Sequence, residues 1–182
     1  TERTRTIFQL ESYADACERG DWLEATIDTA DLNRQPPKPD LRKMRIPLGP
    51  VAVFGAANFP FAYSTAGGDT ASALAAGCTV IVKAHNGHIN TSGMVASAIR
   101  TAVKKNNLPE AVFSYLEGEG NEPGKLLVTH PLLKAVGFTG SLAGGKAIWE
   151  YSNNRKEPIP VFAEMSSVNP VFIFPGKLAT DS

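Results

Sequence analysis

Several polar residues in this chain follow apolar runs and have side chains suited to catalysis. Glu164 comes directly after the apolar run 160–163 and opens the segment Glu-Met-Ser-Ser-Val-Asn-Pro. A carboxylate at such a position can accept a proton from a water molecule that hydrolyses an acyl group. We expect the apolar run to shield Glu164 from water. The alternative is a strand-end Glu held in a salt bridge.

Asn58 lies in the turn Phe-Gly-Ala-Ala-Asn-Phe-Pro-Phe, directly after another apolar run. An amide at this place can donate a hydrogen bond to the oxyanion that forms when a thiolate attacks a carbonyl carbon. The alternative is an Asn whose side chain satisfies the backbone of its own turn. The turn alone does not decide between the two.

Lys83 and the pair Gly140-Ser141 end two further apolar runs and are suited to hold a nucleotide. The ammonium of Lys83 can donate to both hydroxyls of a ribose at the edge where open α/β sheets bind ligands. Gly140-Ser141 opens a predicted helix, whose free N–H groups and partial positive charge can bind a pyrophosphate. The alternatives are a solvated Lys and a Ser that only caps its helix.

The elements that must position these residues alternate between strands and helices. Short apolar or β-branched runs predict strands at 51–55, 79–83, 112–116, 134–138, 159–163 and 171–174. Helical spacing or Ala/Gly-rich composition predicts helices at 7–27 (interrupted at Gly20-Asp21), 65–77, 95–103, 124–129 and 141–151. This alternation predicts an α/β fold: a doubly wound, open parallel sheet with helices on both faces, preceded by an N-terminal helix.

Composition excludes several classes of partner. The 182 residues include 18 basic and 18 acidic side chains, so no net charge favours nucleic acid or a membrane surface. No apolar run approaches the ~18 residues of a membrane span. We interpret Cys17 and Cys78 as buried structural residues of a cytoplasmic protein. His85, His88 and His130 lack ligand spacing, so we expect no metal site.

Taken in order, the segments Asn58-Phe59-Pro60, Lys83, Gly137–Ser141 and Glu164–Pro170 resemble the aldehyde dehydrogenase superfamily. The resemblance is closest to the branch that acts on α-ketoglutarate semialdehyde and fatty aldehydes. It implies an N-terminal helix and Pro-rich linker at 1–40 and a truncated, Rossmann-like NAD(P)-binding domain at 41–182. It also implies a fragment that ends before the nucleophilic Cys of the family.

For the intact enzyme, the resemblance implies NAD- or NADP-dependent oxidation of an aldehyde, such as a semialdehyde, to a carboxylate through a thioester. Asn58 would stabilise the oxyanion and Glu164 would activate water. Lys83, Asn86 and Gly140-Ser141 would hold the cofactor. Asn86 replaces the Glu of many NAD-preferring members, so NADP becomes admissible. The implied partners are a small-molecule aldehyde and further copies of the chain in a homo-oligomer.

The chain departs from the family pattern at two places, and two alternative functions stay open. Ser166-Ser167 stands where the family often has two glycines, which narrows the backbone space beside the nicotinamide. Ala84 stands where the family often has Pro. One alternative is a module that binds nucleotides without turnover, because neither Cys is placed as a nucleophile. The other is an acyl-phosphate reductase, which would not need Glu164.

Overall fold

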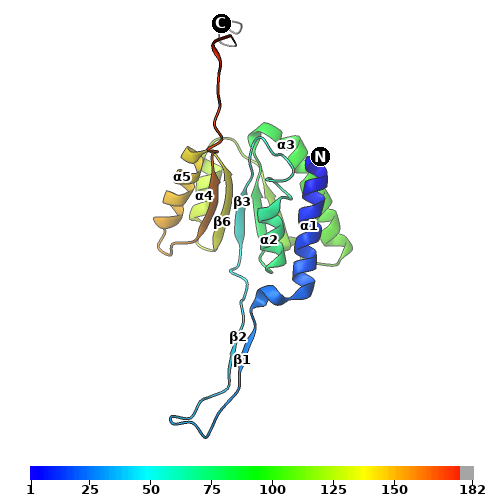
Figure 1. Cartoon of the computed structure of the whole chain (residues 1–182). Helices are drawn as coiled ribbons and strands as arrows, with labels where there is room; N and C mark the ends of the chain where they lie inside the picture. Colours follow the sequence, from blue (N-terminus) through cyan, green and yellow to red (C-terminus); the bar gives the residue numbers. More distant parts are fainter. Residues whose placement is uncertain (177–182) are drawn as a thin grey trace.

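A five-stranded parallel sheet forms the centre of the computed structural model, which describes residues 1–176 (Figure 1). The strands lie in the order β5-β4-β3-β6-β7. Their bounds are β3 Val51–Phe54, β4 Val80–Lys83, β5 Phe113–Leu116, β6 Ala135–Gly140 and β7 Val161–Met165. Each neighbouring pair is parallel. Because the strand order reverses direction between β3 and β6, the sheet is doubly wound, which confirms the predicted fold class.

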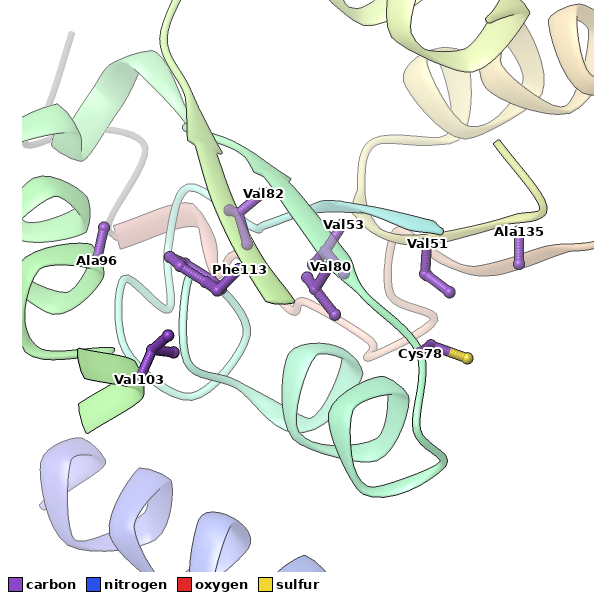
Figure 2. Packing of buried hydrophobic residues seen from close by; sticks show 9 residues of the cluster. All are labelled: Val51, Val53, Cys78, Val80, Val82, Ala96, Val103, Phe113 and Ala135. Carbon is purple, nitrogen blue, oxygen red and sulfur yellow. The ribbon is translucent and has the colours of Figure 1, made fainter. Parts of the chain in front are cut away.

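Helices cover both faces of this sheet. On one face α2 (Gly68–Ala75) and α3 (Ile89–Lys105) pack over a buried apolar cluster, most of which comes from β3, β4 and β5 (Figure 2). On the other face α4 (Glu122–Thr129) and α5 (Leu142–Asn153) pack over a second cluster. Successive residues of β3 enter opposite clusters, as the period of a strand requires. All four residues of β3 are therefore buried.

The N-terminal segment departs from the prediction. α1 (Glu2–Arg19) lies against α2 and ends at Gly20, whose φ of 71° is left-handed (Figure 1). The predicted continuation to Ile27 is wrong. After the short 3₁₀ turn η1 (Asp21–Leu23), the chain enters a strand.

That strand belongs to a two-stranded ribbon that projects from the body of the molecule (Figure 1). β1 (Thr26–Asp28) pairs antiparallel with β2 (Leu41–Lys43). The prolines of the predicted linker lie between the two strands, beyond the paired residues. The segment therefore forms a projecting antiparallel ribbon and is not only a connection to the sheet.

Two further expectations fail in the described residues. Residues 166–174 form no strand, although 171–174 are apolar, because no neighbouring strand supplies hydrogen bonds to them. Cys17 is exposed on α1, so its predicted burial is wrong, while Cys78 is buried as predicted. Among residues 1–176, no helix is long and apolar enough to cross a bilayer.

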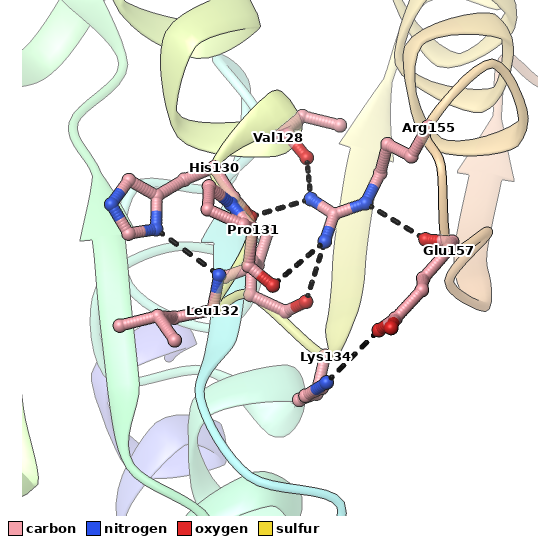
Figure 3. A network of polar contacts seen from close by, with 8 residues as sticks. Val128, His130, Pro131, Leu132, Lys134, Arg155 and Glu157 are labelled. Carbon is pink, nitrogen blue, oxygen red and sulfur yellow. Dashed lines mark hydrogen bonds and ion pairs between the residues drawn. The ribbon is translucent and has the colours of Figure 1, made fainter.

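Arg155 fixes the connection between α4 and β6. It follows α5, and its guanidinium points into the loop that ends α4 (Figure 3). It donates hydrogen bonds to five backbone carbonyl oxygens, those of Val128, His130, Pro131, Leu133 and Glu157. One side chain thereby satisfies carbonyls that the end of a helix leaves without partners. The network holds α4 and α5 together at the amino-terminal end of β6.

Candidate active site

A cavity of about 550 Å³ opens where the strand order reverses. It lies beyond the carboxyl ends of β3, β4 and β6, between α4 and α5. Lys83, Asn86 and Ser141 all line it, and Gly140 directly precedes Ser141 at the end of β6. The structure thus brings the predicted cofactor residues to one place. Asn58 and Glu164 do not line this cavity.

Lys83 ends β4 and is held by neutral acceptors. Its Nζ donates to the carbonyl oxygen of Gly118 at 2.8 Å and to Oδ1 of Asn86 at 3.1 Å. Burial lowers the pKa of Lys83. No carboxylate among the described residues lies within ion-pair distance of this ammonium. Its charge and its third donor therefore remain available to a ligand.

His85 forms part of the cavity wall beside Lys83. Burial, then the neighbouring His88 and Lys83, lower the pKa of His85. Its Nδ1 accepts a hydrogen bond from the backbone N–H of Gly87 at 3.0 Å. The ring is stacked on that of His88, with 5.3 Å between the ring centroids. The wall at this point is therefore an aromatic surface next to the Lys83 ammonium.

Two hydroxyl groups cap the amino-terminal end of α5. Oγ of Ser141 accepts from the backbone N–H of Gly144 at 3.1 Å. Oγ of Ser166, which follows β7, accepts from the backbone N–H of Leu142 at 3.2 Å. Ser166 has a φ of 62°, a conformation that favours glycine. Ser141 is thus a helix cap, as one of the two interpretations holds, and the cap also forms part of the cavity wall.

Asn58 lies in the exposed part of the turn between β3 and α2. Long-range contacts from α1 and from His88 hold this turn. Nε2 of His88 lies 2.8 Å from the carbonyl oxygen of Ala56. Oε1 of Glu2, in the first turn of α1, accepts from the backbone N–H groups of Phe61 at 2.8 Å and Ala62 at 2.9 Å.

Glu164 lies on β7 opposite Thr139 of β6. Its side chain is exposed, so the expected shielding from water is wrong for the described residues: β7 is an edge strand and nothing covers it there. The half-buried Asp69 in the first turn of α2 faces the same region. Burial, and secondly the charge of Glu164, raise the pKa of Asp69. Two carboxyl groups therefore influence one another here.

Sequence reasoning missed two residues that support the Asn58 turn. The sequence alone indicates no role for His88, whose spacing does not suit a metal site, and none for Glu2. The available signal for His88 is a Ser four residues later, at the spacing that faces it on a helix. Within residues 1–176, no group of three or more His, Cys, Asp or Glu side chains could hold a metal ion.

Known proteins resemble the chain over nearly its whole length. It is 56% identical over 179 residues to alpha-ketoglutaric semialdehyde dehydrogenase 2 of Azospirillum brasilense, covering 98% of this chain and 34% of that protein. It is 52% identical over 178 residues to alpha-ketoglutaric semialdehyde dehydrogenase of Acinetobacter baylyi, covering 97% of this chain and 34% of that protein. The chain therefore spans about a third of the length of these relatives.

Solved structures share the fold. A glyceraldehyde-3-phosphate dehydrogenase from Methanocaldococcus jannaschii, complexed with NADP, superposes with a TM-score of 0.74 at 23% identity, over 93% of this chain and 34% of that one. A 1-pyrroline-5-carboxylate dehydrogenase superposes with a TM-score of 0.74 at 26% identity, over 90% of this chain and 30% of that one. The model of the aldehyde dehydrogenase family matches residues 1–177. These matches confirm the resemblance drawn from the motifs, and the chain belongs to the aldehyde dehydrogenase family.

Proposed function

We propose that this chain supplies the cofactor-binding part of an enzyme that oxidises an aldehyde to a carboxylate with NAD or NADP. Family membership supports the reaction type. The names of the two relatives at 56% and 52% identity support a semialdehyde, such as alpha-ketoglutaric semialdehyde, as the substrate. Since the chain spans 34% of those relatives, the activity is proposed for the intact enzyme.

The volume and the small wall residues of the cavity support a dinucleotide as its ligand. α4 and α5 face it with small residues: Gly124, Ala143, Gly144 and Ala147. A Cβ at position 124 would lie 3.2 Å from the Phe54 ring, and one at 144 would lie 3.1 Å from the Phe138 ring. Side chains at these two glycines would therefore narrow the space between the helices. The small residues leave room for a flat base.

Lys83, Asn86 and the start of α5 would hold the cofactor. The ammonium of Lys83 and the amide of Asn86 are suited to ribose hydroxyls, and the α5 terminus is suited to the diphosphate. Asn86 brings no negative charge that would repel a 2′-phosphate, so the site admits both cofactors. When bound, the nicotinamide would supply the hydride acceptor of the reaction.

Asn58 and Glu164 would act on the acyl group. Cys78 lies before the amino-terminal end of β4, and Cys17 contacts the carbonyl oxygen of Ala75 at the end of α2, so neither is near Asn58. We therefore propose that the rest of the enzyme supplies the nucleophilic thiolate. The Asn58 amide would donate to the oxyanion that forms when this thiolate adds to the carbonyl carbon. Glu164 would accept a proton as water forms a bond to the thioester carbon and the C–S bond breaks.

The meeting of Lys83, Asn86 and Ser141 in one cavity carries this proposal, and cofactor titration of the intact enzyme tests it. Lys83→Ala should weaken the binding of NAD and NADP by about 1.5–3 kcal/mol, the range for a hydrogen bond to a charged group. Because Asn86 adds no charge, NADP should lose at least as much affinity as NAD.

The matched control is Lys104→Ala, which removes an exposed ammonium from α3 and should leave both affinities unchanged. If Lys83→Ala also left both unchanged, the role of Lys83 would be limited to its hydrogen bonds with Gly118 and Asn86. The cavity would then lose its main link to a nucleotide.

A further inference from the structure

The His88 side chain links α3 to the turn that carries Asn58. It ends the 3₁₀ turn η2 (Asn86–His88) and directly precedes α3. Both ring nitrogens have partners: Nε2 lies 2.8 Å from the carbonyl oxygen of Ala56, and Nδ1 lies 2.9 Å from Oγ of Ser92. A carbonyl oxygen only accepts, so Nε2 carries the hydrogen. In the neutral ring, Nδ1 then accepts from the Ser92 hydroxyl.

The support behind His88 is rigid. Ser92 is fully buried in α3, so water does not compete for its hydroxyl group. The Tyr115 hydroxyl donates to the carbonyl oxygen of Ile89 at 3.2 Å, which ties β5 to the first turn of α3. His88 therefore projects from a fixed point, and its Nε2–H has a defined position.

The contact that His88 makes lies two residues before Asn58. Ala56 is only 3% exposed, and its backbone N–H donates to the carbonyl oxygen of Tyr63 at 2.7 Å across the turn. Its carbonyl oxygen is the group that Nε2 of His88 contacts. The hydrogen bond thus fixes the backbone at the start of the turn, upstream of the Asn58 side chain.

We propose that His88 is a positioning residue for the Asn58 amide. The inference rests on the proposed role of Asn58 as a donor to the oxyanion. Such a donor must lie about 2.7–3.1 Å from the oxyanion, and a misplacement of about 1 Å costs about a hundredfold in rate. The Ser92–His88–Ala56 chain of hydrogen bonds sets that position. Loss of the hydrogen bond from His88 to Ala56 should slow formation of the acyl enzyme, whether or not cofactor affinity changes.

The test compares two substitutions in the intact enzyme, His88→Gln and His88→Asn. Both carry the same amide group, but only the longer Gln can reach the Ala56 carbonyl oxygen. The readouts are the pre-steady-state rate of NAD(P)H formation with a saturating semialdehyde and the dissociation constant of the cofactor. We expect His88→Asn to lower the rate about 10- to 100-fold and His88→Gln to recover most of it. Both variants lose the stacking of His88 on His85, so they should bind the cofactor within about twofold of one another.

The exposed His130 provides the matched control, because its side chain contacts the backbone N–H of Leu132 and does not line the cavity. His130→Asn should leave the rate unchanged. Equal rates for His88→Gln and His88→Asn would overturn the proposal. A difference in cofactor affinity between the two variants that matches their difference in rate would also overturn it.

The second arm combines His88→Asn with Asn58→Ala. If His88 acts only through Asn58, the double variant should be no more than about twofold slower than Asn58→Ala alone. A further tenfold loss in the double variant would overturn the positioning role while leaving that of Asn58 intact. If Asn58→Ala alone left the rate unchanged, the proposed role of Asn58 would fail, and the inference about His88 with it.

Discussion

Replacing Arg155 should destabilise the folded chain more than any change to the surrounding surface. Arg155→Ala removes five hydrogen bonds to backbone carbonyl oxygens (Figure 3). The bonds to His130, Pro131 and Glu157 are exposed, so water can replace them at little cost.

The bonds to Val128 and Leu133 are different because they are partly buried. These two residues are 0% and 2% exposed, so their carbonyl oxygens have poor access to water. An unsatisfied buried acceptor costs about 1–3 kcal/mol, and the lower half of that range suits a partly buried site. The two together give an expected loss of about 2–4 kcal/mol in the free energy of unfolding.

Urea denaturation followed by circular dichroism measures this loss, with the m-value as a check on the two-state assumption. Arg155→Lys keeps the charge but has no planar fork, so it should recover only a small part of the stability. Lys156→Ala, at the exposed neighbouring position, should be neutral. A change below about 0.5 kcal/mol for Arg155→Ala, the level of an ordinary surface substitution, would refute the reasoning.

Two further predictions concern the carboxyl groups near β7. In the intact enzyme, Glu164→Gln should keep the initial burst of NAD(P)H and slow steady-state turnover about 10²- to 10⁴-fold, because only the hydrolysis step needs a base; equal loss of both phases would place Glu164 in another role. Asp69→Asn should raise the free energy of unfolding at pH 7. Burial, and secondly the charge of Glu164, raise the pKa of Asp69 above its ordinary 3.8. The folded state therefore favours the protonated carboxyl, and the stability that this form contributes is lost as pH rises through the raised pKa. Asn carries no charge at any of these pH values, so the variant avoids that loss. Denaturation curves from pH 3 to 7 should show the advantage of the variant vanish on acidification, and a pH-independent difference would contradict it.

The centre of the sheet could be predicted because β3 and most of β6 are buried on both faces. Runs such as Val51–Phe54 are continuous in apolar residues, a pattern that few exposed segments share. The β1–β2 ribbon lacks this signal. Ile27 and Leu41 are 68% and 54% exposed, so neither strand has an apolar face that repeats along the sequence. Its pairing depends on register across the intervening prolines, which local propensity does not encode.

The candidate site could be predicted in part, for a related reason. Lys83 is the last residue of β4, and Ser141 directly follows β6. Parallel strands bring their carboxyl ends to one edge of the sheet, so these two residues lie near one another. The contacts that hold the Asn58 turn follow no such rule. His88 and Ala56 are 32 positions apart, and Glu2 and Phe61 are 59 positions apart. Such contacts depend on how helices dock, which a single sequence does not reveal.

The bonds from Phe61 and Ala62 to Glu2 make two amide protons direct reporters of the docking of α1. While the Glu2 carboxylate holds them, these protons are protected from exchange with deuterated water. They become free only when α1 separates from the turn or the whole domain unfolds. Their exchange rates therefore give the free energy of this local opening. Each opening event also removes the Glu2 contacts from the turn that carries Asn58, so the first helix of the chain helps to keep that turn ordered.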